Sequence, residues 1–322
     1  VTSIGDSAFG GCDALSEIAI PATVTEVGRQ AFGGSGLKNV RIESSATKID
    51  STAFNKCLVE RATVPTSAIP LIPKDNLKRV EITEGAAIDA SRFKGYASLE
   101  EVKLGDTVTS IGSNAFENCT SLASVTINGN VTTIENNVFY GCRSLTGIDL
   151  PENVTTIGGQ VFDGCGSLTS ITIPAKVTSI GYKAFNGCTA LASVYVSDMN
   201  AWCKIDFSYT NTNNPLYYAK NLYLNNQLVT ELTLTDAVIA GNTLKGYKKL
   251  TTLTINGKST VDSSAFADCT GLTSVSIGGT TSLKGYVFKG CTALKTVTIT
   301  GNVADLGEST FYGCKALTSV TF

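Results

Sequence analysis

The chain has no histidine among its 322 residues, only one Trp and one Met, and only 16% charged residues. Without histidine, the Ser–His and Cys–His nucleophile pairs and the usual zinc-binding patterns are excluded. The net charge of −2 comes without a basic run, so nucleic acid and anionic membranes are not expected as partners. No apolar stretch approaches the roughly 18 residues that span a bilayer, so direct membrane insertion is not expected either.

The most prominent feature that is present is a repeat. Phe93, Phe116, Phe139, Phe162 and Phe185 follow one another at intervals of 23 residues. The same register position is occupied elsewhere by Phe9, Phe32, Phe54, Leu244, Phe266, Phe288 and Phe311. A fixed period of about 20–50 residues marks an array of units, each too small to bury its own apolar face. The sequence therefore predicts an α/β repeat solenoid over residues 1–322, with about 13 coils of about 22–23 residues.

Each unit contains a strand pattern and a turn pattern. In the segment 168–174, Ile171 and Ile173 alternate with Ser170 and Thr172, which is the period of a half-buried strand. Outward strand positions are mostly hydroxyl residues: Ser124, Thr126, Ser170, Thr172, Ser274, Ser276, Thr296 and Thr298. Two residues after the register position stands Gly, Asn or Asp in almost every unit, with Lys56 as an exception. These residue types tolerate a left-handed backbone, so we expect a short helical turn closed by its cap.

Two stretches interrupt the repeat, and we expect irregular coils at 58–84 and 199–228. The first contains Pro65, Pro70 and Pro73 ahead of a degenerate coil. The second contains the single Trp, several tyrosines including Tyr209, and Cys203. We expect Trp202 to fill the core, since large aromatic side chains dominate buried area, and Cys203 to be exposed.

Ten cysteines are present, but no Cys-x-x-Cys pair. Nine of them stand three residues after the register position, for example Cys119, Cys142, Cys165 and Cys188. The Cβ atoms of equivalent cysteines on stacked coils would lie ~5 Å apart. A disulfide requires a distance of ~3.5–4.5 Å between its Cβ atoms. We therefore predict a ladder of buried, reduced thiols that pack as small hydrophobic groups.

No constellation for catalysis, cofactor binding or metal binding is present in the sequence. The usual general base is missing, and carboxylates such as Asp149 and Glu152 fall at strand or turn positions typical of solvated surface. No catalytic, cofactor-binding or metal-ligating residue and no cofactor is therefore predicted. An enzyme is the least favoured class.

The repeat also has a recognisable family pattern. Its frame of Ile-Pro, Val-Thr, Ile-Gly, Ala-Phe and Gly-Cys, clearest in 171–196, resembles the BspA-like, Treponema-type leucine-rich repeats over most of the chain. The resemblance implies a right-handed leucine-rich-repeat coil with a parallel sheet on the concave side and the turns on the convex side. It also implies a secreted or surface-anchored protein of a host-associated bacterium. Members are often adhesins for matrix proteins such as fibronectin or fibrinogen, and no fixed binding residues carry over.

The function expected from these features is non-enzymatic adhesion or protein binding at the cell surface. The partner would be a host matrix protein or another cell-surface macromolecule. The alternative is a carbohydrate-binding surface module, which exposed aromatic side chains on one face would favour. The only candidate ligand-binding residue is Tyr195, a large aromatic among outward Ser and Thr side chains. We read the chain as a mature or trimmed fragment, so a signal peptide, cap or anchor would lie outside it.

Overall fold

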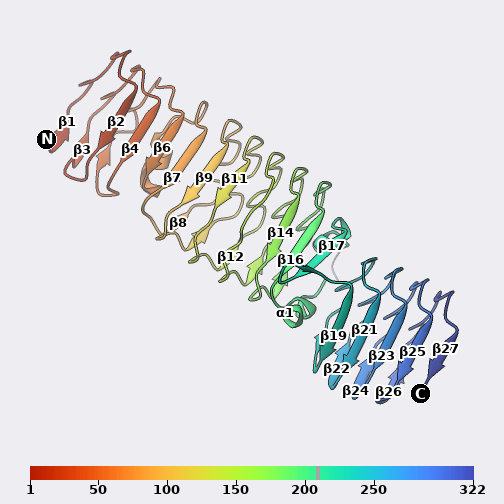
Figure 1. The fold of residues 1–322 in the computed structure, drawn as a ribbon. Helices are drawn as coiled ribbons and strands as arrows, with labels where there is room; N and C mark the ends of the chain where they lie inside the picture. The colour runs from red at the N-terminus through yellow and green to blue at the C-terminus, as the bar shows by residue number, and fades with distance from the viewer. Residues whose placement is uncertain (208–210) are drawn as a thin grey trace. The chain divides into compact units, whose positions relative to one another are not determined.

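The computed structural model describes residues 1–207 and 211–322, so Tyr209 lies outside the described residues. The chain divides into two compact units (Figure 1). The first comprises Val1–Val154 and Val161–Leu168, and the second comprises Thr155–Gln160 and Thr169–Phe322. The described residues form about 14 turns of a parallel-strand solenoid with few helices, close to the predicted number.

The first unit is built on one long-stranded parallel sheet and a set of two-residue strands. The long strands, in spatial order, are β2 (Glu17–Ile20), β4 (Asn39–Ile42), β6 (Arg61–Val64), β7 (Arg79–Ile82), β9 (Glu101–Leu104) and β11 (Ser124–Thr126). The short strands are β1 (Ser3–Ile4), β3 (Glu26–Val27), β5 (Lys48–Ile49), β8 (Ala87–Ile88), β10 (Ser110–Ile111) and β12 (Thr133–Ile134). A 3-10 helix, η1 (Thr66–Leu71), lies between β6 and β7.

The second unit repeats this plan with an interruption. Its first long strands are β14 (Ser170–Ile173), β16 (Ser193–Val196) and β17 (Asn221–Leu224), and the antiparallel β18 (Gln227–Leu228) ends that sheet. A second sheet contains β19 (Glu231–Thr235), β21 (Thr252–Asn256), β23 (Ser274–Ile277), β25 (Thr296–Ile299) and β27 (Ser319–Thr321). A second row of strands contains β13 (Thr156–Ile157), β15 (Ser179–Ile180), β20 (Val238–Ile239), β22 (Lys258–Val261), β24 (Thr280–Leu283) and β26 (Asn302–Leu306). The helices are α1 (Met199–Lys204), η2 (Asn211–Asn213) and η3 (Pro215–Tyr217).

The strands follow the predicted alternation. Ile171 and Ile173 are buried, whereas Ser170 is half-buried and Thr172 is exposed. Adjacent strands pair in register, with Ile171 beside Val194, so that like positions form columns along each stack. Because one side chain of each kind recurs in every turn, the apolar residues form one continuous core in each unit.

The register phenylalanines form stacks at the centre of this core. Phe93, Phe116, Phe139 and Phe162 are fully buried, and successive ring centroids lie 5.1, 5.6 and 5.8 Å apart with nearly parallel planes. In the second unit, Phe288 continues the pattern, with its ring 5.7 Å from Phe266. The periodic Phe residues therefore pack upon one another rather than facing solvent, as the repeat predicts.

Each unit has the expected short hydrogen-bonded turn, in which the Cys12 amide, for example, donates to the Phe9 carbonyl at 3.3 Å. The predicted left-handed residue after the register position is present, even at Lys56, where φ is 62°. A second left-handed residue precedes the register position, for example Ser7 with a φ of 55°. Two such residues four positions apart prevent a longer helix, and alternate backbone donors point along the stack. The Phe9 amide, for example, donates to the Ala31 carbonyl of the next turn at 2.6 Å.

The described parts of the two regions predicted to be irregular contain regular elements. Within 58–84, β6 pairs in register with both neighbours, and the irregular chain is confined to η1 and the residues that follow it. In α1, Trp202 is buried, which confirms its expected role as core filling. The expectation that Cys203 is exposed is wrong. The Asp198 carboxylate caps α1, and the helix turns Cys203 inward together with Trp202.

The cysteine ladder is buried as predicted except at its ends, Cys12 and Cys314, and its thiols have a role that spacing does not reveal. The Cys119 thiol donates to the Phe93 carbonyl of the preceding turn at 3.0 Å. The same bond recurs along the ladder, with Cys142 donating to Phe116 at 3.2 Å. Burial raises the pKa of the Cys119 thiol to about 12. The thiols are therefore weak donors that tie one turn to the next, held in their protonated form.

We expect thiol reactivity to divide the cysteines sharply. Cys12 is exposed and Cys314 is partly exposed, whereas the other cysteines are buried. A thiol-reactive chromogenic disulfide at pH 8 should label Cys12 quickly and Cys314 slowly, because reaction requires an accessible thiolate. The remaining thiols should react only after denaturation. Prompt labelling of Cys119 or Cys203 in the native protein, located by peptide mapping, would contradict this arrangement.

Candidate ligand-binding surfaces

Each unit has a strand face, which we define as the outward side chains of its long strands. In the second unit this face places Tyr195 of β16 directly beside Tyr223 of β17. Their rings stack 4.8 Å apart at an angle of 13°, and both side chains are half-buried. Leu228 of β18, which is partly exposed, pairs with Tyr223. The single residue singled out from the sequence is therefore part of a small apolar patch.

Tyr223 could have been found from the sequence, because it occupies the outward position of the strand pattern Asn221–Leu224. The rest of this face carries the expected hydroxyl side chains, such as Ser274 and Thr296, which are half-buried or exposed. The tyrosine pair is therefore the main departure from an otherwise uniform polar surface in the long strands of this unit.

The strand face of the first unit is charged. The sequence pattern predicted mostly Ser and Thr side chains at these outward positions. Register pairing aligns one column through Glu17, Asn39, Arg61, Arg79, Glu101 and Ser124. The neighbouring column contains Ala19, Arg41, Thr63, Glu81, Lys103 and Thr126. Arg79 pairs with Glu101 at 3.4 Å, and Lys103 with Glu81 at 2.7 Å. Exposed pairs of this kind add little stability, so the charges are available for recognition.

Arg61 differs from the other cations of these columns, because Arg41, Arg79 and Lys103 each form an ion pair. It lies in register between Asn39 and Arg79 and makes no ion pair within 4 Å among the described residues. Together with Glu17, Arg41 and Thr63 it lines a shallow groove on the strand face. A planar guanidinium without an internal partner is suited to a carboxylate on another molecule.

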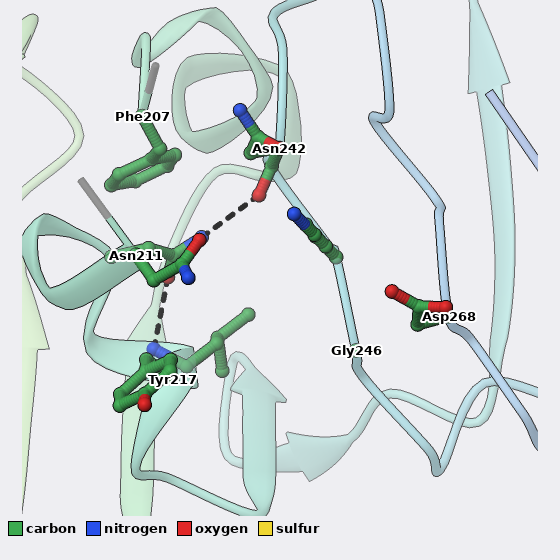
Figure 2. A pocket seen from close by; sticks show the side chains of 9 residues that line it. Phe207, Asn211, Tyr217, Asn242, Gly246 and Asp268 are labelled. Atoms are coloured by element: carbon green, nitrogen blue, oxygen red, sulfur yellow. Dashed lines mark hydrogen bonds between the residues drawn. The ribbon is translucent and has the colours of Figure 1, made fainter. Parts of the chain in front are cut away.

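A second hollow lies on the turn side of the second unit, beside its interruption. Figure 2 shows Phe207, Asn211 and Tyr217 on one side of this hollow, and Asn242, Gly246 and Asp268 on the other. Leu216 and Lys245 complete the lining, with the buried Asn214 between the two sides. The hollow has a volume of about 210 Å³ and opens to solvent. We call it the turn hollow.

The described residues 1–207 and 211–322 contain no group of three or more His, Cys, Asp or Glu side chains arranged to hold a metal ion. Asp149 and Glu152 are exposed, as expected for surface carboxylates. In the same part of the chain, no helix has both the length and the apolar character needed to cross a membrane.

Comparison with solved structures shows the same fold. A leucine-rich-repeat protein from Bacteroides ovatus is 23% identical, with a TM-score of 0.50, over 99% of this chain and 82% of that one. A leucine-rich cell-surface protein from Faecalibacterium prausnitzii is 25% identical, with a TM-score of 0.35, over 100% and 83% of the two chains. The T. pallidum leucine-rich-repeat protein is 22% identical, with a TM-score of 0.37, over 73% and 83%. None of the curated proteins matches the chain.

The family is established by a separate match. The model of the BspA-type leucine-rich-repeat region matches six copies, over residues 2–78, 86–213 and 219–322. The match includes the Phe columns and the thiol ladder described above, and it extends across most of both units. The chain therefore belongs to the family of BspA-type leucine-rich-repeat proteins.

Proposed function

We propose that this chain is a non-enzymatic, protein-binding module of a bacterial surface protein. It adheres through its strand faces to a host matrix protein or to another cell-surface macromolecule. The observation that supports this most directly is the tyrosine pair, Tyr195 and Tyr223, on a regular and otherwise polar sheet. Tyr and Arg are enriched among the residues that dominate protein–protein binding energy. The charged columns around Arg61 add a second type of contact, suited to acidic side chains.

A carbohydrate-binding strand face is the competing function, and the ring geometry disfavours it. Tyr195 and Tyr223 stack upon each other, and on their other sides Tyr195 has Thr172 and Tyr223 has Leu228 as register neighbour. A sugar needs an open ring face on which to lie, whereas a protein side chain can also contact ring edges and the phenol hydroxyls. The stacked pair therefore favours a protein partner on this face.

Tyr195→Ala is expected to weaken binding to a matrix protein by about tenfold or more, since it removes half of the central aromatic patch. Binding of the 322-residue chain to immobilised fibronectin and fibrinogen at physiological salt measures this. Tyr182→Ala is the matched control, because Tyr182 is an exposed tyrosine outside the strand face. Equal losses for both variants would refute the role of the strand face. Binding to glycans that Tyr195→Ala abolishes, with no binding to either matrix protein, would favour the competing function, and turnover of a substrate would refute the non-enzymatic assignment.

A further inference from the structure

The geometry points to a second binding site: the turn hollow takes one neutral sugar residue of a glycan. This site is separate from the strand face and does not depend on its partner. Its volume of about 210 Å³ is below the roughly 300–1,000 Å³ that is usual for sites of drug-sized ligands, so the hollow admits about one sugar ring and no more.

The hollow exists because the repeat is interrupted there. On one side, the turn at 242–247 bonds normally to the next turn, with the Leu244 amide donating to Ala265 at 2.9 Å. On its other side stands η3 instead of a regular turn. The Asn214 carboxamide bridges the two, donating to the carbonyls of Asn242 and Thr243 at 3.1 Å each, and accepting from the Leu216 amide at 2.9 Å. Because Asn214 is buried and fully bonded, it holds the hollow open as a preformed site.

One wall of the hollow is apolar and fixed. Phe207 and Leu216 are buried and line this side. Tyr217 is 57% exposed, and its ring meets Tyr218 edge to face at 4.9 Å. Tyr218 is itself anchored, since its hydroxyl accepts a hydrogen bond from the Gly187 amide at 3.0 Å. Tyr217 therefore offers an exposed aromatic surface against which the C–H groups of a ring can pack.

The facing wall is polar, and its side chains are free. Asn242, Lys245 and Asp268 line it, and none of the three uses its side chain in an ion pair or hydrogen bond to the described residues. Figure 2 shows the Asp268 carboxylate turned toward the hollow. Asp268 has a φ of 60° and occupies the slot that most turns fill with glycine. Asp268 thus carries a side chain at a left-handed backbone position, where glycine is favoured.

The chemistry of these groups selects the ligand class. A carboxylate only accepts hydrogen bonds, an ammonium group only donates them, and a carboxamide does both. Lys245 and Asp268 cancel in charge, so neither an anion nor a cation is preferred. Sugar hydroxyls both donate and accept, so a neutral sugar satisfies all three polar side chains while its apolar face lies on Tyr217. A zwitterionic peptide end is the rival ligand, because it could pair with Lys245 and Asp268 alone.

The test is saturation-transfer NMR of the 322-residue chain with the methyl glycosides of glucose, galactose, mannose, fucose and N-acetylglucosamine. We expect at least one glycoside to bind, and Tyr217→Ala and Asp268→Asn each to weaken it by about tenfold or more. Asn is the suitable replacement, because Asn118 already occupies the equivalent slot with a φ of 58°. Tyr312→Ala, at an exposed tyrosine on another turn, is the control and should leave affinity unchanged.

Three results would overturn the site: no glycoside binds, the two hollow variants bind like the parent chain, or glycylglycine displaces the sugar. Unfolding curves of each variant separate loss of the site from loss of the fold. Tyr195→Ala should leave sugar binding intact, so a failure of the strand face and a failure of the turn hollow are distinguishable.

Discussion

Phe139→Ala is expected to lower the free energy of unfolding by about 3–5 kcal/mol. Phe139 is fully buried, and its ring lies between those of Phe116 and Phe162, at 5.6 and 5.8 Å. Truncation removes both ring contacts at once and leaves a cavity that the neighbouring rings cannot fill, because they are packed against further rings. Urea unfolding followed by circular dichroism measures the loss.

The control for this variant is Thr126→Ala in the same unit. Thr126 is an exposed residue of β11, and its truncation should cost less than about 1 kcal/mol. Similar losses for Phe139→Ala and Thr126→Ala would mean that the inward and outward assignments of the repeat are wrong.

Gly279→Ala is expected to destabilise the second unit by about 2–5 kcal/mol. Gly279 has a φ of 68°, which costs a residue with a side chain roughly 1–2 kcal/mol. A Cβ there would also lie only 2.4 Å from the Gly257 carbonyl oxygen and 2.6 Å from its nitrogen. Relieving that overlap requires the two turns to separate, at a further cost of about 1–3 kcal/mol.

Gly246→Ala isolates the first of these two costs. Gly246 also has a left-handed backbone, with a φ of 76°, but a Cβ there meets no atom within 4 Å. It should therefore lose only about 1–2 kcal/mol, from backbone strain. Denaturant unfolding of both variants gives the difference, and equal losses would show that the spacing of the turns tolerates a methyl group at position 279.

The repeat could be predicted from the sequence because its determinants are local. The spacing of Phe93 and Phe116, and the Gly or Asn two residues later, reflect packing and backbone constraints that recur in each unit. The left-handed residue before the register position, such as Ser7, could not be predicted because that position has no distinctive residue type. The inward orientation of Cys203 depends on how α1 packs against the core. The repeat pattern does not predict this packing, because α1 lies where the repeat is interrupted.

The candidate sites were harder to predict because they depend on juxtaposition across turns. Tyr195 stood out in the sequence, but its contact with Tyr223 requires the chain to return in register 28 positions later. The turn hollow depends on Asn214 reaching the carbonyl of Asn242, a contact across an interruption of the repeat. Such contacts do not follow the period of the repeat in the sequence, so they are seen only in the folded structure.

The in-register columns have a consequence for how proteins of this kind can change in length. Where Phe116 lies upon Phe93 and Phe139 upon Phe116, the upper surface of one turn is equivalent to that of the next. Gain or loss of a whole turn within such a stretch joins surfaces that already match, and it creates no new type of contact. The length of the protein can thus change by duplication or loss of regular turns. The irregular turns, and the hollow beside one of them, keep their structure in the longer or shorter protein.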